Sequence, residues 1–492
     1  MTLSNRLQRS FAAQQAAAIE RNGLWRSWGE VGQLAGQVNA ILTRQDIAPD
    51  VRVGLIGRNR PWTTSAFLGI LAEERCVVPI NPFQPQDRIL QDVAQLDLAA
   101  LIGEPEDYEN GAIAACAREL GFAALMLDGA RWSIELLEGR RQNRDLLYEP
   151  NALLMATSGT TGPPKRVPIR KDTLLTGAID AQSVGLEFGE EPLPPSQQSP
   201  LIQYSPLVHI GGALSVARAG VHGRRLIVPE KFKADDWVAA IERFGHRSAG
   251  LPPAMMRMVI ELNPPADALR SLVAVWSGSA PIDRAVARSF SDRYGATVLG
   301  SYGATEFCGV VANGRLADVG RFGPETLAAV GRIRPNVANA RIVDPSGGAP
   351  LGFGSQGLLE LQVHRVGPEW MRTSDLAALD PNGFLYLYGR ADDAINRGGF
   401  KIVPTVITDV LKSHPAVRDA AVVGVRHERL GEAPVAVVEI EGPDAQVSSE
   451  DLMAFARARL VAYQVPLVIR VVDRLPRTPS MKIDRQAVKA LF

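Results

Sequence analysis

Cysteine is scarce in this chain of 492 residues, and the three that occur lie far apart. Cys76, Cys116 and Cys308 are odd in number and show no spacing typical of a metal site. Neither a disulfide framework nor a metal-binding module is therefore expected, and a reducing compartment, the cytoplasm, is the predicted location. Long apolar runs are also missing: none approaches the roughly 20 residues that cross a bilayer, so no membrane span is predicted.

The chain has no excess of charge of either sign, because Lys plus Arg and Asp plus Glu both number 53. A general binder of nucleic acid or of an anionic membrane needs a surplus of basic residues, so neither class is expected. What is present is an ordinary globular composition, 46% hydrophobic and 22% charged. The length suits about three domain-sized units, and both a monomer and a homodimer remain open.

The first residues allow two interpretations. Residues 1–19 contain Arg, Ser and Ala but no acidic residue, as in some transit peptides. The preferred prediction is an ordinary first helix with Leu7, Phe11, Ala18 and Ile19 on one face. A second amphipathic helix is predicted over 25–42.

Short apolar runs alternate with helical patterns along most of the chain. This alternation predicts parallel sheets with helices on both faces, and its two stretches predict two similar subdomains. The predicted strands are 51–57, 77–80, 99–102, 123–127 and 152–156, then 201–206, 225–228, 248–251, 272–276 and 297–299.

Towards the C-terminus the pattern changes twice. Gly and Pro punctuate short strands over 330–388, which predicts a small β-rich subdomain. Beyond it, a compact α+β module is predicted, in which Ser448 and Asp451 form a capping box before a helix. The predicted fold class is therefore α/β, with a large N-terminal domain over 1–389, a hinge at 390–392 and a small mobile α+β domain over 393–492.

One loop between two predicted strands has the composition of a phosphate cradle. Glycine lets the backbone approach an anion, hydroxyls and amides donate hydrogen bonds, and lysine supplies charge. It is not a Walker P-loop, because position 164 is proline and no helix follows. The loop reads Thr157, Ser158, Gly159, Thr160, Thr161, Gly162, Pro163, Pro164, Lys165.

This loop and four later motifs, in order, resemble the adenylate-forming (AMP-binding) enzymes. That family includes acyl-CoA synthetases, peptide-synthetase adenylation domains and firefly luciferase, and the resemblance is strongest to acid–CoA ligases. It extends over nearly the whole chain. The later motifs are 301–306 (SYGATE), 373–375 (TSD), 389–393 (GRADD) and 476–485 (PRTPSMKIDR).

The resemblance implies a nucleotide site built from several motifs. Tyr302 would stack on adenine, a task that suits a flat aromatic ring. Asp375 would accept hydrogen bonds from the ribose hydroxyls, and Arg390 would bind nucleotide oxygens. The nucleotide-binding residues implied are Thr157, Ser158, Gly159, Thr160, Thr161, Gly162, Lys165, Gly278, Ser279, Ala280, Ser301, Tyr302, Gly303, Asp375 and Arg390.

The resemblance also assigns the chemistry, with ATP and Mg²⁺ as cofactors and coenzyme A as co-substrate. Lys482 would be the catalytic lysine, whose ammonium group stabilises the charge that gathers where the substrate carboxylate meets the α-phosphate. Thr305 would donate to the α-phosphate, and Glu306 would hold Mg²⁺, which prefers carboxylate and phosphate oxygens. His209 would gate the thiol tunnel or orient the acyl carbonyl.

The implied cycle has two half-reactions, acyl-AMP formation and transfer of the acyl group to a thiol. The C-terminal domain would rotate about Asp392 between them, so that Lys482 leaves the site and segment 394–402 enters it. Arg397 and Lys401 are candidates for contacts with coenzyme A phosphates. The residues implied to line the thiol tunnel are Gly398, Gly399, Phe400 and Lys401.

The acid is the least determined part of the prediction. Family members that take α-amino acids carry an aspartate where this chain has Ile210, and members acting on malonate carry an arginine where it has Ser301. An ammonium group would be buried unpaired here, so a neutral aromatic or aliphatic carboxylic acid is expected. The implied acyl pocket comprises His209, Ile210, Gly211, Gly278, Ser279, Phe307 and Cys308.

One departure from the family pattern concerns the catalytic loop. Met481 stands where a glycine is usual, directly before Lys482, and a side chain there restricts the backbone. Two alternatives therefore stay open beside the acid–CoA ligase. One is a stand-alone adenylating enzyme that loads a separate carrier protein, and the other is a catalytically impaired nucleotide-binding homologue.

Overall fold

The computed structural model describes residues 1–141, 148, 150–157, 165–183, 194, 197–398, 400–441, 447–478 and 481–492. Contacts within the chain divide it into two compact units: unit 1 extends to Gly323, and unit 2 extends from Pro324 to Phe492. We describe each unit by itself. The predicted hinge at 390–392 falls within unit 2 and concerns a rotation, so it stays a prediction.

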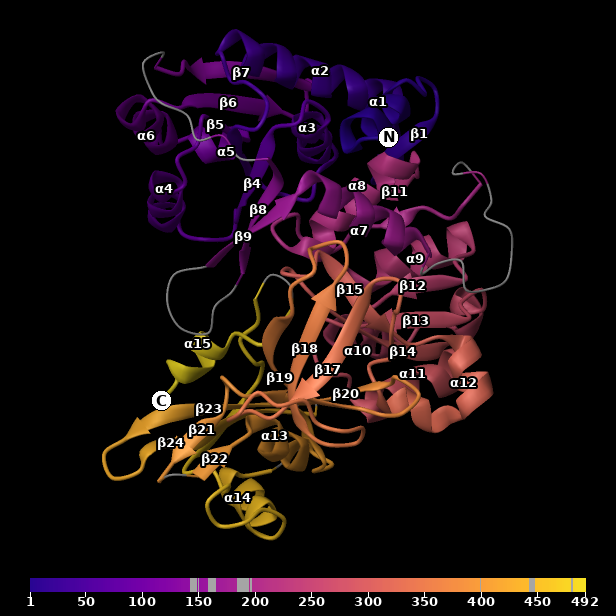
Figure 1. Ribbon diagram of the computed structural model, residues 1–492, viewed down its shortest axis with the longest axis vertical. Helices are drawn as coiled ribbons and strands as arrows, with labels where there is room; N and C mark the ends of the chain where they lie inside the picture. The colour runs from indigo at the N-terminus through magenta and orange to yellow at the C-terminus, as the bar shows by residue number, and fades with distance from the viewer. Residues whose placement is uncertain are drawn as a thin grey trace. The chain divides into compact units, whose positions relative to one another are not determined.

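The largest sheet of unit 1 has seven strands in the order β7-β6-β5-β3-β4-β8-β9 (Figure 1). Its inner strands run parallel and only the two edge pairs are antiparallel. The central strands are buried along their length, as the continuous apolar runs predict. The strands are β3 (Arg52–Ile56), β4 (Cys76–Ile80), β5 (Ala100–Gly103), β6 (Ala123–Asp128), β7 (Ser133–Glu138), β8 (Asn151–Thr157) and β9 (Lys165–Arg170).

A second sheet of unit 1 repeats the theme with β12, β13 and β14 parallel and β15 antiparallel. Its strands are β12 (Ser248–Gly250), β13 (Ala274–Ser277), β14 (Thr297–Ala304) and β15 (Gly309–Asn313). The helices of unit 1 beyond the N-terminal pair are α3 (Pro61–Ala72), α4 (Gln86–Gln95), α5 (Pro105–Tyr108), α6 (Ala112–Leu120), α7 (Lys171–Ser183), α8 (Ile210–His222), α9 (Ala234–Phe244), α10 (Pro253–Leu262), η2 (Ala266–Leu269), α11 (Arg284–Tyr294) and α12 (Leu316–Phe322).

The N-terminal prediction is wrong in one respect. Helix α1 (Leu3–Phe11) ends early, and Ala18 and Ile19 lie in strand β1 (Ala17–Arg21) instead of on the helix. Strand β1 pairs with β2 (Leu24–Ser27) and, from far along the chain, with β11 (Leu226–Ile227), which also pairs with β10 (Leu201–Ile202). A capping box at Ser27 then begins α2 (Trp28–Arg44). The distant partner strand explains the error, because local periodicity carries no record of it.

Unit 2 combines the predicted β-rich part with the predicted α+β module. An antiparallel sheet has the order β17-β18-β19-β20, and a second sheet has the order β22-β21-β24-β23, with β25 beside β24. The Ser448–Asp451 capping box is present. The elements are η3 (Pro324–Ala328), β16 (Arg332–Ile333), β17 (Ala338–Val343), β18 (Gly357–Val363), β19 (Met371–Leu379), β20 (Leu385–Arg390), β21 (Ile395–Arg397), β22 (Phe400–Ile402), α13 (Pro404–Lys412), β23 (Val417–His427), β24 (Gly431–Ile440), α14 (Ser449–Arg457), β25 (Ile469–Val472) and α15 (Arg485–Lys489).

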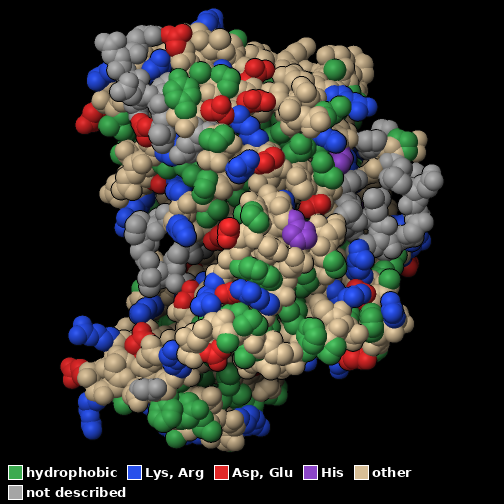
Figure 2. Space-filling view, in the orientation of Figure 1, with side chains coloured by type: hydrophobic (Ala, Val, Ile, Leu, Met, Phe, Trp, Pro, Cys, Tyr) green, Lys and Arg blue, Asp and Glu red, His purple; other side chains and the backbone are tan. Residues whose placement is uncertain are grey.

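The surface carries both signs of charge intermixed. On the face shown in Figure 2, Lys and Arg side chains alternate with Asp and Glu over most of the described elements. This agrees with the balanced composition of the sequence. Of the helices that the structure describes, none has the length and apolar character needed to cross a membrane.

Candidate functional site

The predicted phosphate loop connects the two strands of an antiparallel hairpin. Thr157 is the last residue of β8 and lies opposite Lys165, the first residue of β9. The Thr157 hydroxyl donates to the Lys165 carbonyl oxygen at 3.2 Å. The structure therefore has the predicted strand–loop–strand arrangement, while the loop residues Ser158, Gly159, Thr160, Thr161 and Gly162 lie outside the described residues.

A close backbone approach joins the ends of two neighbouring parallel strands, β13 and β14. A Cβ atom at Gly278 would lie 2.8 Å from the Ser301 carbonyl oxygen, so only glycine fits there. Ser279 follows with a φ of +68°, and both it and Ala280 are exposed. Carboxyl ends of parallel strands are where α/β proteins bind ligands, and a non-glycine residue held in the left-handed region is typical of functional loops.

The turn between β14 and β15 holds the two residues predicted to contact phosphate and metal. Thr305 and Glu306 occupy its tip, closed by hydrogen bonds from the Phe307 and Cys308 amides. Glu306 is exposed and has no side-chain partner within the described part of the chain. Such a carboxylate suits a hard cation, so Glu306 fits Mg²⁺. Tyr302 packs at the base of this turn, its ring centroid 6.2 Å from that of Phe307.

The start of α8 carries the predicted acyl-end residues. His209 is the N-cap residue, Ile210 is half-buried and Gly211 is exposed. Helices α7 and α8 both contact β15, the strand that follows the Thr305–Glu306 turn. Cys308, also predicted for the acyl pocket, is fully buried, and a Cβ on Gly177 of α7 would lie 3.2 Å from its sulfur. Its side chain packs in the core of unit 1, and its role in the acyl pocket stays a prediction.

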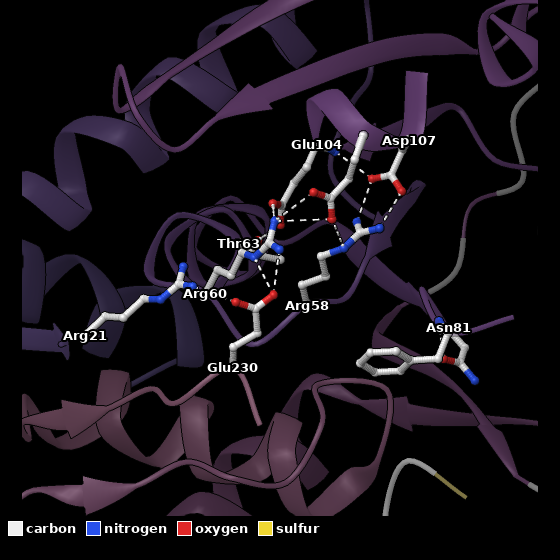
Figure 3. A network of polar contacts seen from close by, with 10 residues as sticks. Arg21, Arg58, Arg60, Thr63, Asn81, Glu104, Asp107 and Glu230 are labelled. Carbon is white, nitrogen blue, oxygen red and sulfur yellow. Dashed lines mark hydrogen bonds and ion pairs between the residues drawn. The ribbon is translucent and has the colours of Figure 1, made fainter. Parts of the chain in front are cut away.

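Sequence reasoning did not find a charged network at the carboxyl ends of β3 and β5 (Figure 3). Arg58 makes a bidentate ion pair with Asp107, at 2.7 and 2.8 Å. Arg60 pairs with Glu104 and donates two hydrogen bonds to Glu230. Burial alone would raise the pKa of Glu230, but hydrogen bonds and charge from Arg60 outweigh it and lower that pKa. The only sequence signal was a polar run directly after a buried strand.

Asn59, which lies between Arg58 and Arg60 in the sequence, connects this network to the segment that precedes His209. Its side-chain amide donates to the carbonyl oxygens of Gln203, Tyr204 and Ser205, at 3.4, 3.4 and 3.2 Å. This segment leads into His209 through a turn in which the His209 amide donates to Pro206. The network thus supports the backbone that carries the predicted histidine.

In unit 2, four predicted residues lie together. Asp375 on β19 is the cross-strand partner of Arg390 on β20. Arg390 donates to both carboxylate oxygens of Asp392, at 2.8 and 2.6 Å. These hydrogen bonds raise the pKa of Arg390 and lower that of Asp392. The side chain of Lys482 is exposed to solvent. Protein atoms around it nevertheless remove part of its hydration, and this desolvation, followed by the positive charge of Arg390, lowers the pKa of its ammonium group.

The residues predicted to line the thiol tunnel belong to the β21–β22 hairpin of unit 2. Gly398 has a φ of +57°, and its amide donates to the Leu430 carbonyl oxygen at 2.8 Å. Phe400 and Lys401 are exposed, and Gly399 lies outside the described residues. Glycine suits the left-handed conformation at 398, which fixes the direction in which the hairpin turns.

Met481, directly before the predicted catalytic lysine, has a backbone conformation that favours glycine. Met481 has a φ of +64° and lies in a turn where its amide donates to Thr478, whose own amide donates to Lys482. A side chain in the left-handed region costs about 1–2 kcal/mol. Methionine instead of glycine at position 481 therefore introduces backbone strain into the loop that contains Lys482.

Replacing Met481 tests this strain. Because glycine relieves the left-handed conformation and alanine does not, Met481→Gly is expected to be more stable than Met481→Ala by about 1 kcal/mol. The apparent Tm of the Gly variant should then exceed that of the Ala variant by roughly 2 °C. Thermal unfolding of the two variants checks this, and equal Tm values would show that the loop carries no strain.

Comparison with known proteins decides the family. A family model described as AMP-binding enzyme matches residues 8–367, and one described as AMP-binding enzyme C-terminal domain matches 407–482. The chain belongs to the AMP-binding enzymes. The predicted family is therefore confirmed, and the motifs described above lie within or between the two matched regions, except that the final motif extends to 485, past the end of the second match.

Curated relatives of this AMP-binding enzyme are CoA ligases. It is 30% identical to 4-coumarate–CoA ligase-like 5 of Oryza sativa subsp. japonica, over 68% of this chain and 61% of that relative. It is 29% identical to 2-succinylbenzoate–CoA ligase of Bacillus cereus, over 99% of this chain and 98% of that relative. The crystal structure of ATP-bound MatB from Rhodopseudomonas palustris has a TM-score of 0.84 at 22% identity, covering 100% of this chain and 99% of that one.

These likenesses confirm the predicted fold class and enzyme class. The fold is that of the adenylate-forming enzymes, and the expectation of an AMP-forming acid–CoA ligase that uses ATP, Mg²⁺ and coenzyme A agrees with relatives that are CoA ligases by name. Loading of a separate carrier protein is not favoured by them. At 29–30% identity the relatives leave the acid undetermined.

Proposed function

We propose that this AMP-binding enzyme joins a neutral aromatic or aliphatic carboxylic acid to coenzyme A. The acid carboxylate attacks the α-phosphate of ATP, which releases pyrophosphate and gives an acyl-AMP. The thiolate of coenzyme A then attacks the acyl carbonyl carbon and releases AMP. The observation that carries the proposal is the grouping of Asp375, Arg390 and Lys482 in unit 2, the residues of three separate family motifs.

Each of these residues has a proposed role in the first half-reaction, the formation of acyl-AMP. In unit 1, Thr305 would donate to the α-phosphate and Tyr302 would stack on adenine. Glu306 would hold Mg²⁺, which supplies positive charge to the phosphates. In unit 2, Asp375 and Arg390 would bind the nucleotide, and Lys482 would stabilise the charge that develops between carboxylate and phosphate.

Two features support a neutral acid. Ile210 and Gly211, at the start of α8, offer no charged group to an ammonium or a second carboxylate, and burying such a charge unpaired is costly. Ser301 donates its hydroxyl to the Ser277 carbonyl oxygen at 3.3 Å, and it too brings no charge. One relative is named 4-coumarate–CoA ligase-like 5, and the aryl acid in that name favours the aromatic class.

The test is a panel of acids with ATP and Mg²⁺, each with and without coenzyme A. The panel contains benzoates, cinnamates and short, medium and long straight-chain acids, together with amino acids and dicarboxylates as charged comparators, with pyrophosphate release followed and products identified by mass. Release together with an acyl-CoA product from a neutral acid is expected. Activity confined to amino acids or dicarboxylates would contradict the proposed acid class, and acyl-AMP without any thioester would contradict the acceptor.

A further inference from the structure

The β21–β22 hairpin, residues 395–402, is fastened through one arginine. The Nη1 atom of Arg397 donates to the backbone carbonyl oxygens of Tyr463 and Val465, at 2.7 and 3.0 Å. The ring of Phe400, on the other strand of the hairpin, stacks on the ring of Tyr463, with centroids 4.6 Å apart and planes at 13°. Both strands of the hairpin therefore hold the same short segment, 463–465.

The segment that receives these contacts is itself anchored. It continues directly into the stretch before β25, where the Leu467 amide donates to Pro434 at 2.8 Å and the Ala436 amide donates to Val468 at 2.9 Å. These bonds fix it to β24, the central strand of the sheet. Arg397 and Phe400 thus attach an exposed hairpin to a part of unit 2 that is held by backbone hydrogen bonds.

The two ends of the hairpin, Ile395 and Ile402, are buried in the core of unit 2, and its remaining contacts are made with β24 and the turn before it. Its only ladder pair with β24 in the described residues joins Arg397 to Gly431. The Gly398 amide donates to Leu430, and the Asn396 amide donates to the Glu432 carboxylate at 3.0 Å. Hydrogen bonds with an ionised donor or acceptor are about twice as strong as neutral ones, so the two guanidinium contacts and the Asn396–Glu432 bond are the strong polar contacts of the hairpin, and the guanidinium contacts are the ones that join it to segment 463–465.

We propose that Arg397 is a positioning residue for the thioester half-reaction, because it holds the hairpin in the shape that receives the thiol. This inference rests on the proposed function, in which Phe400 and Lys401 line the thiol tunnel. Arg397 then acts through the hairpin and not on coenzyme A itself, since its Nη1 atom is engaged by two carbonyl oxygens. Acyl-AMP formation does not use the hairpin and is independent of Arg397.

The test separates the two half-reactions in Arg397→Ala, Arg397→Lys and a control, Arg457→Ala. Arg457 is exposed in the last turn of α14 and has no partner in the part of the chain that the structure describes. Acyl-AMP formation is measured without thiol, and thioester formation is measured from preformed acyl-AMP. We expect Arg397→Ala to lower kcat of the thioester step by about tenfold or more, because the variant loses the two charge-assisted hydrogen bonds that hold the hairpin. The rate of acyl-AMP formation by Arg397→Ala, and both rates of the control Arg457→Ala, should stay within twofold of wild type. Arg397→Lys should recover part of the lost thioester rate.

A second acceptor tells positioning from phosphate binding. Pantetheine carries the thiol of coenzyme A without its phosphates, so the tenfold loss should be the same with either thiol. Tyr463→Ala removes the stacked ring but keeps the carbonyl acceptor, and its effect should be less than additive with that of Arg397→Ala because both act on one hairpin.

Two results would overturn the inference alone: a loss that disappears with pantetheine, or one that falls equally on both half-reactions. A wild-type enzyme that forms acyl-AMP but no thioester with either thiol contradicts the proposed function as well, and the inference falls with it.

Discussion

Lys482→Ala is expected to lower the rate of acyl-AMP formation by about a hundredfold to a thousandfold, the usual cost of removing one group that stabilises transition-state charge. Lys482 is the only lysine of the final motif, and it lies near enough to Arg390 for that charge to lower its pKa. Binding of ATP should change little, because adenine, ribose and Mg²⁺ have other proposed ligands.

The matched control is Lys489→Ala, an exposed lysine in the last turn of α15. It should adenylate at the wild-type rate. Pyrophosphate release under single-turnover conditions measures both variants, and ATP affinity is measured in parallel. A Lys482→Ala variant with near-wild-type adenylation would remove the central catalytic role from the final motif. Absence of turnover in the wild type itself would instead support the impaired-homologue alternative.

The lowered pKa of Lys482 gives the same prediction a pH dependence. As pH rises, a lysine with a lowered pKa loses its proton before an ordinary lysine does, whose value is 10.5. Adenylation that needs the charged ammonium should therefore decline with a midpoint below 10.5. Arginine stays protonated throughout, so Lys482→Arg should be slower at neutral pH but lack this decline. A decline of equal midpoint in both variants would assign it to another group.

Asp107→Ala is expected to lower the free energy of unfolding by about 3 kcal/mol, as removal of one partner of a buried ion pair does. The side chains of Asp107 and Arg58 are only 5% and 13% exposed. Without Asp107, Arg58 keeps one carboxylate, Glu106, at 2.5 Å, which places the effect at the lower end of the range for buried pairs. The Glu104 amide also loses its acceptor at 2.7 Å.

The control for this variant is Asp87→Ala, an exposed aspartate in the first turn of α4. It should change stability by no more than about 0.5 kcal/mol. Urea unfolding followed by tryptophan fluorescence measures both. Because Figure 3 places Asp107 at the far side of the network from Glu230, a small effect of Asp107→Ala would mean that Arg60 and its carboxylates hold this sheet edge without Arg58.

Local patterns predicted the parts of the fold that neighbours in sequence determine. The strands β3 to β6, the helix α2 and the cap at Ser448 lie where periodicity and capping residues place them. Pairings across long stretches of chain left no local signal. Ile19 therefore appeared helical although it pairs with Leu226.

The candidate site was likewise predicted only in part from the sequence. The motif residues were found because their order is shared with a known family, and the turn at Thr305 and Glu306 has the exposure that a phosphate and metal contact needs. The supporting contacts were not found, although Arg397 had been named as a candidate for coenzyme A binding. Asn59 acts on carbonyl oxygens at 203–205, and Arg397 acts on those at 463 and 465. Backbone acceptors give no residue-type signal, so only the structure identifies these contacts.

The most direct test of adenylation traces the carboxyl oxygen atoms of the acid into the products. An acid that the panel identifies is labelled with ¹⁸O in its carboxyl group and turned over with ATP, Mg²⁺ and coenzyme A, and the products are weighed by mass spectrometry. Attack of the carboxylate on the α-phosphate predicts AMP that carries one ¹⁸O atom, unlabelled pyrophosphate, and an acyl-CoA that retains one. Label in inorganic phosphate, with ADP as the nucleotide product, would show an acyl-phosphate route and contradict adenylation.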